Sequence, residues 1–135
     1  MMKNECYTYF SIKGNFDPGV ISDILNLAPC KQWSIGDKRA NGTEYDFALW
    51  EFGRCDDYNI LVENQMIQTI TPLLSKVDEL RRIKSEYDVS LTLEIVPSVY
   101  AGETEPCLAP SSEIIKFCYE TGTDIDIDLY VLKSE

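Results

Sequence analysis

Two periodicities of apolar residues divide this chain into strand-like and helix-like stretches. Residues 89–96 alternate between apolar and polar side chains, which predicts a strand with one buried face. Residues 7–13 are rich in aromatic and β-branched side chains and predict an earlier strand. In residues 18–28 and 62–83 the apolar positions recur three and four apart, which predicts two amphipathic helices.

Capping residues set the expected ends of these helices. Asp17, directly followed by a proline, suits the N-cap of the first helix. A further short helix is expected to start after Ser111 and to end at Gly122. Pro72 lies inside the long helix and removes a backbone donor, so the helix is expected to break there, with Thr71 capping the second piece.

The predicted elements follow the order β-α-β-β-α-β-α-β. Residues 31–35 and 43–52 are expected to pair as a hairpin, because turn dipeptides lie between them. The order and the alternating strands predict a single α+β domain over residues 1–135, with a mostly antiparallel sheet and helices packed on one face, ferredoxin-like in character. The last strand, 123–131, is expected to turn four apolar residues inward: Ile125, Ile127, Leu129 and Val131.

Composition favours a soluble globular protein. Hydrophobic residues make up 44% of the 135 residues and charged residues 26%. No apolar run approaches the roughly 20 residues that a membrane-spanning helix needs, so no membrane association is expected. The first residues lack the pattern of a secretory signal, which makes the cytoplasm the expected location.

Several classes of active site are excluded by the residues that the chain lacks. There is no histidine, so a Ser-His-Asp or Cys-His catalytic group and a histidine-ligated metal are ruled out. The five cysteines are widely spaced and form no zinc motif, and they are expected to be reduced, mostly packed thiols. Phosphate-binding loops and other catalytic motifs are also missing. We therefore expect no metal and no cofactor, and catalysis has no positive support.

The net charge of −11 is distributed unevenly. Residues 1–43 contain five basic and four acidic residues, so the negative charge lies in the rest of the chain. Such a field disfavours binding to nucleic acid and favours a basic protein as partner. Solubility alone also accounts for an acidic composition.

Three aspartates form the sharpest chemical pattern. Asp124, Asp126 and Asp128 alternate with apolar residues, so all three carboxylates point to one face of the last strand. If strand 89–96 lies beside this strand, Glu94 joins the same face, and like charges there need a positive group over them. The candidates are Lys133, Arg81, Arg82, a bound cation or a basic partner. A solvated strand face that resists edge-to-edge pairing explains the same pattern.

A second candidate site surrounds the Trp33-Ser34-Ile35-Gly36-Asp37-Lys38-Arg39 segment. Gly36 permits a tight turn, and Asp37 is followed by two cations. An aromatic wall beside an arginine suits a small anionic or planar ligand. A hairpin turn whose tryptophan fills the core is the more common explanation of such a segment. The residues of this candidate ligand site are Trp33, Gly36, Asp37, Lys38, Arg39, Tyr45 and Trp50.

The W-x-x-G-D element at Trp33, the helix that starts with Asp17 and proline, and the I-D-x-D-x-Y strand that ends at Tyr130 occur together. In this combination the chain resembles the bacterial domain-of-unknown-function family four-two-seven-nine, from about Tyr7 to Tyr130. The resemblance implies a fold but no activity. Two hypotheses follow: a small acidic protein-binding module, immunity- or antitoxin-like, that uses its C-terminal acidic face, or a small-molecule-binding protein or weak-signature enzyme that uses the Trp33–Arg39 loop.

Overall fold

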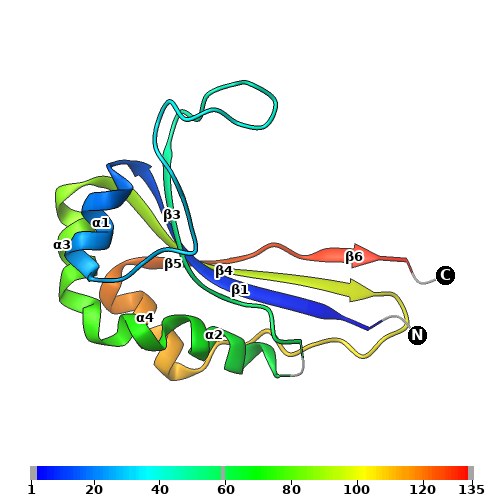
Figure 1. Cartoon of the computed structure of the whole chain (residues 1–135). Coiled ribbons are helices and arrows are strands. Elements are labelled where there is room, and N and C mark those ends of the chain that lie inside the picture. Colours follow the sequence, from blue (N-terminus) through cyan, green and yellow to red (C-terminus); the bar gives the residue numbers. More distant parts are fainter. Residues whose placement is uncertain (1–2, 59, 134–135) are drawn as a thin grey trace.

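A single sheet with helices on one of its faces makes up the protein, as described by a computed structural model over residues 3–58 and 60–133 (Figure 1). In these residues the strands are β1 (Glu5–Asn15), β2 (Lys31–Trp33), β3 (Ala48–Cys55), β4 (Asp88–Tyr100), β5 (Thr123–Ile127) and β6 (Tyr130–Leu132). The helices are α1 (Pro18–Leu25), α2 (Val62–Ile70), the 3₁₀ helix η1 (Thr71–Lys76), α3 (Val77–Glu86) and α4 (Ser112–Thr121). The predicted α+β class is confirmed.

The strands lie in the order β2-β3-β1-β4-β5, and β6 pairs with the far end of β4. β1 pairs antiparallel with β3 and β4, and β2 pairs antiparallel with β3. β5 and β6 instead run parallel to β4, so the sheet is mixed. The reason is α4, which carries the chain back across the sheet before β5 begins, as a crossover connection requires. The predicted last strand is divided into β5 and β6.

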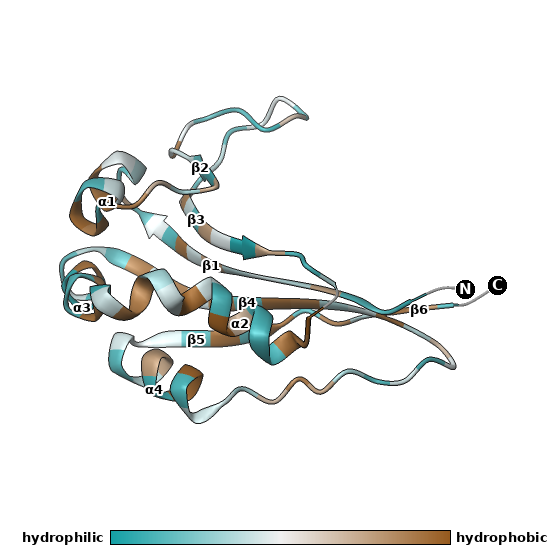
Figure 2. Cartoon of the chain, turned by 60° about the horizontal axis from the view of Figure 1, so that its bottom comes forward, coloured by the Kyte–Doolittle hydropathy of each residue, from teal (hydrophilic) through white to brown (hydrophobic). Residues whose placement is uncertain are grey.

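The hydrophobic core lies between the sheet and the helices. Apolar side chains from alternate positions of β1, β3 and β4 face α1–α4, whose apolar stripes are seen in Figure 2. Phe10 packs edge-on against Phe117 of α4, with ring centroids 6.3 Å apart. Trp50 is fully buried under α1, where its indole Nε1 donates a hydrogen bond to Ser22 Oγ at 3.0 Å. The helices therefore cover one face of the sheet only.

The structure confirms most of the expected caps. Asp17 accepts a hydrogen bond from the N–H of Gly19, Ser111 caps α4, and Gly122 ends α4 in the left-handed conformation. The expected cap at Thr71 is wrong. Its hydroxyl donates to the carbonyl of Ile67 in α2, so it bonds to the helix before the break and caps nothing after it. The chain continues through the break as the 3₁₀ helix η1.

The apolar residues of the last strand are not buried as expected. Ile125 is 37% exposed, Ile127 44%, Leu129 50% and Val131 70%. The cause is position: β5, β6 and the residues between them form the edge of the sheet beside β4, so the helices that cover β1 and β4 leave these side chains partly in solvent. An apolar stripe therefore remains at this edge of the sheet.

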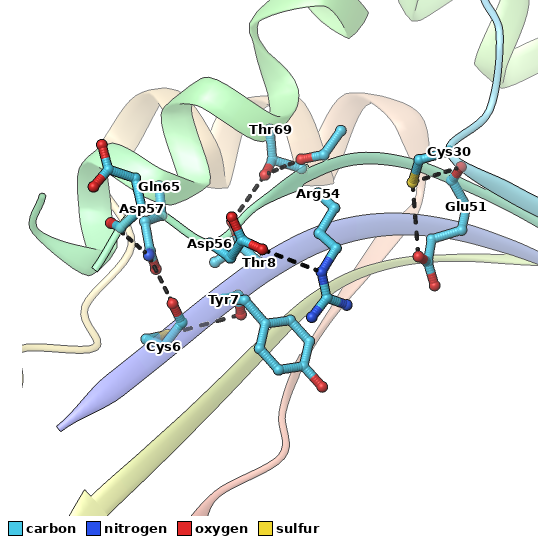
Figure 3. Close-up of polar contacts among 11 residues, drawn as sticks. Cys6, Tyr7, Thr8, Cys30, Glu51, Arg54, Asp56, Asp57, Gln65 and Thr69 are labelled. Carbon is cyan, nitrogen blue, oxygen red and sulfur yellow. Dashed lines mark hydrogen bonds and ion pairs between the residues drawn. The ribbon is translucent and has the colours of Figure 1, made fainter. Parts of the chain in front are cut away.

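A hydroxyl pair joins α2 to the sheet (Figure 3). Thr69 Oγ1 donates to the carbonyl of Gly53 at 2.7 Å and lies 2.8 Å from Thr8 Oγ1, and both threonine side chains are fully buried. We expect Thr69→Val to lower the free energy of unfolding by about 1–3 kcal/mol, because it leaves buried polar groups unpaired at nearly constant volume. Urea titration measures the change. Thr71→Val is the control, since its hydroxyl bond is exposed and its loss is expected to cost about 0.5 kcal/mol or less. Equal effects of the two substitutions would contradict the role given to Thr69.

Candidate functional site

The face of the sheet opposite the helices, here called the open face, has no helix over it (Figure 1). Strand registers align its polar side chains in rows across the strands. One row joins Tyr9 of β1, Glu94 of β4 and Asp126 of β5. The next joins Ser11 and Thr92, with further carboxylates at its two ends, from Glu51 and Asp124. The open face is therefore polar and rich in carboxylates.

The acidic ladder consists of Asp124, Asp126 and Asp128. All three are exposed, and the structure places Asp126 directly beside Glu94 on the neighbouring strand. The carboxylate of Asp128 accepts a hydrogen bond from the hydroxyl of Tyr130 at 3.2 Å. The ladder and Glu94 therefore share one face. This arrangement was expected from the sequence if the two strands lie side by side, and they do.

Glu94 differs from the ladder because its side chain is buried, with 8% exposed. Burial, a hydrogen bond with Asp126 and the charges of Asp126 and Asp128 raise the pKa of Glu94 to about 7, and Lys13 opposes that shift. Near neutral pH the Glu94 carboxyl therefore carries a proton in part of the molecules. In that form it donates a hydrogen bond to the Asp126 carboxylate.

No cation of the described chain closes an ion pair with Glu94 or the acidic ladder. Within residues 3–58 and 60–133, the ion pairs shorter than 4.0 Å are Arg54–Asp56, Arg82–Glu86 and Lys116–Glu120. Arg82, one of the candidates to cover the ladder, is thus engaged on α3. The three exposed aspartates of the ladder therefore remain accessible to a positive group from outside.

Tyrosine and arginine side chains line the β1–β3 part of the open face, and sequence reasoning missed them. The guanidinium of Arg54 lies 3.9 Å from the ring centroid of Tyr7 (Figure 3), and the rings of Tyr7 and Tyr9 stack at 6.1 Å. Burial and the carboxylates of Glu94 and Glu51 raise the pKa of Tyr9. The available signal was the polar and aromatic side of the first strand, where positions 7 and 9 alternate with the core residues.

Beside Tyr9 on β1, the hydroxyl of Ser11 is buried with no hydrogen-bond partner among the described residues. Its cross-strand neighbours are Glu51 and Thr92. Since no helix covers this face, the longer side chains around the serine exclude water from it.

The second candidate site lies on the long connection between β2 and β3, which projects from the sheet away from the helices (Figure 1). The rings of Trp33 and Tyr45 stack in parallel, with centroids 3.9 Å apart. Arg39 lies over the Tyr45 ring at 4.4 Å, and Lys31 lies over Trp33 at 5.4 Å. The aromatic faces of Trp33 and Tyr45 are thus used for contacts among these four side chains.

Backbone contacts hold the turn of this loop. Gly36 has a φ of +91° and donates its N–H to the Tyr45 carbonyl, and Asp37 accepts from the N–H of Ser34. Lys38 lies in a β-bridge with Glu44. The loop therefore brings together six of the seven predicted ligand-site residues. Trp50 is not among them, because it faces the core under α1.

The rest of residues 3–58 and 60–133 contains a pocket but no metal-binding cluster. Among these residues, no three or more cysteines, aspartates or glutamates are arranged to hold a metal ion. A pocket of about 190 Å³ lies near the start of α2, lined in part by Cys6, Leu61 and Gln65, and it contains none of the predicted site residues. None of the helices in residues 3–58 and 60–133 has the length and apolar character that a membrane crossing requires.

Comparison with known proteins gives a family but no function. No curated protein and no solved structure matches this chain. A family model described as "Domain of unknown function (DUF4279)" matches residues 4–132, almost the entire chain. The protein therefore belongs to the DUF4279 family.

Proposed function

We propose that the protein is a small binding module, immunity- or antitoxin-like, that holds a basic protein partner on its open face. The observation that supports this function most directly is a set of four neighbouring carboxyl groups that form no ion pair with any described residue: Glu94, Asp124, Asp126 and Asp128. Such a group of charges is unfavourable unless a cation lies over it.

The electrostatics of Glu94 support the same proposal. Because burial and its carboxylate neighbours raise the pKa of Glu94, a cation placed over the row from Glu94 to Asp126 stabilises the ionised form of both groups. A basic partner therefore gains more at these positions than at an isolated surface carboxylate. The loop around Trp33 offers less support for the small-molecule alternative, because its aromatic faces are already occupied by Arg39, Tyr45 and Lys31.

The test is a double charge reversal on the acidic ladder. Asp126→Lys with Asp128→Lys is expected to lower retention of the partner at least about tenfold, in affinity capture from the host lysate followed by mass spectrometry. In the unmodified protein, raising the salt concentration is expected to release the same partner, because exposed charge pairs are screened. Circular dichroism checks that the variant is folded.

A matched control separates the ladder from total charge. Asp23→Lys with Glu63→Lys makes the same change in net charge at exposed positions of α1 and α2, on the other side of the sheet. This variant is expected to keep its partner. If ladder and control variants capture the partner equally well, the open face is not the binding surface and the proposal fails.

A further inference from the structure

The edge strand β5 has free backbone groups as well as charge. It is the last strand in the sheet order of the described residues and pairs with β4 alone along its length. The N–H of Asp128 donates to the Ile95 carbonyl of β4 at 2.8 Å. Alternation along the strand therefore turns the N–H and C=O groups of Ile125 and Ile127 toward the open edge. These groups can pair with one further strand.

The side chains at this edge are acidic on one face of the sheet and apolar on the other. On the open face are the carboxylates of Asp124 and Asp126, and on the helix side are Ile125 and Ile127, 37% and 44% exposed. An added strand would place alternate side chains against each set. The strand that complements both sets alternates between basic and apolar residues.

A second copy of this chain does not suit the edge. In an antiparallel two-fold pairing of β5 with β5, the residues opposite each other lie on the same face, so the aspartates of one copy would face those of the other. Like charges directly across two strands destabilise the pairing. The charge of the edge therefore selects a different, basic occupant.

We propose that β5 binds its partner by strand addition: an extended segment of a basic protein, with basic and apolar residues in alternation, extends the sheet beyond Thr123–Ile127. This inference rests on the proposed function and specifies how the acidic face recognises its partner. The apolar side chains of the added strand pack on Ile125 and Ile127, and its basic side chains lie against the acidic ladder and Glu94.

Two synthetic peptides of equal composition test the binding mode. One alternates, as blocked Lys-Val-Lys-Val-Lys-Val-Lys, and the other has all valines followed by all lysines. Fluorescence anisotropy is expected to give at least about tenfold tighter binding for the alternating peptide, because only its pattern matches both faces of the edge. Hydrogen exchange of the Ile125 and Ile127 amides is expected to slow when this peptide is bound.

Variants of the protein complete the test. Ile125→Lys with Ile127→Lys is expected to remove the preference for the alternating peptide. The control, Leu74→Lys with Ile115→Lys, makes the same charge change at exposed apolar residues elsewhere and is expected to retain it. Equal binding of both peptides, without slowed exchange, would overturn strand addition and leave a purely electrostatic acidic face, as the proposed function requires. Binding of neither peptide would also overturn the inference, whereas failure of the proposed function is decided separately by the Asp126 and Asp128 reversal.

Discussion

Gly14→Ala is expected to destabilise the fold by about 3 kcal/mol or more, a loss outside the range of ordinary substitutions. Gly14 lies at the end of β1 with a φ of +150°, which side-chain-bearing residues rarely adopt. A Cβ atom there would lie 2.1 Å from the carbonyl oxygen of Asp88 and 2.9 Å from the Cα of Val89. Both are backbone atoms of β4, so the clash is relieved only by separating the two strands.

A second glycine provides the control. Gly42 also has a positive φ, +87°, but a Cβ atom there would meet nothing within 4 Å. Gly42→Ala therefore carries backbone strain alone, about 1–2 kcal/mol. Urea unfolding of both variants separates backbone strain from the steric clash. Equal losses of unfolding free energy would show that the close approach of β1 and β4 at Gly14 does not affect stability.

The Gly14 contact matters for the candidate site because it fixes the pairing of the two central strands. Gly14 pairs with Val89, and the same register places Tyr9 beside Glu94. A shift by one residue would turn Glu94 toward the core. The geometry of the open face therefore depends on a contact at the far end of these strands.

Features that depend on a few consecutive residues could be predicted from the sequence. The caps at Asp17 and Ser111 are of this kind, because a side-chain oxygen bonds to an N–H two or three residues later. Thr71 shows the limit of local reasoning. Its hydroxyl can bond either to a carbonyl of the preceding helix or to an N–H of the following one. Only the packed structure decides between the carbonyl of Ile67 and a cap.

Features that depend on register could not be predicted in this way. Trp33 and Trp50 belong to neighbouring strands, and the observed pairing sets Trp33 against Leu49 and Trp50 against Gln32. The two tryptophans therefore lie on opposite faces of the sheet. Their grouping into one ligand site required the other register, and β2 is too short and too exposed for its own apolar pattern to indicate which of the two is formed.

The same reasoning applies to the last strand. Its alternation of aspartate and isoleucine predicts two faces, and the structure has both of them. The sequence does not indicate that the strand lies at the edge of the sheet, where the helices cover it incompletely. The expected burial of Ile125 and Ile127 is therefore wrong. The pairing of β5 with β4, and with it the contact between Asp126 and Glu94, arises from the α4 crossover.

Glu94→Gln is expected to stabilise the protein above neutral pH, by at most about 3 kcal/mol. The pKa of Glu94 is about 7 in the folded protein against an ordinary value of 4.5. Between these two values the folded chain keeps a proton that the unfolded chain releases, so stability falls as pH rises from 4.5 to 7. Below pH 4.5 both forms are protonated and the penalty vanishes. The amide of the E94Q variant donates to Asp126 as the protonated carboxyl does, at every pH.

Urea titrations at pH 5 and pH 8 measure this difference. Glu94→Gln is expected to have a small effect at pH 5 and its full stabilising effect at pH 8, whereas Glu105→Gln, in an exposed loop, is expected to change little at either pH. An effect of Glu94→Gln that is equal at the two pH values would show that the carboxyl is not strained in the folded state. The expected result has a functional meaning, because the penalty carried by ionised Glu94 in the free protein is relieved when a basic partner covers it. Stability at neutral pH and affinity for that partner are then opposed at one residue, and Glu94→Gln is expected to raise the first while weakening the second.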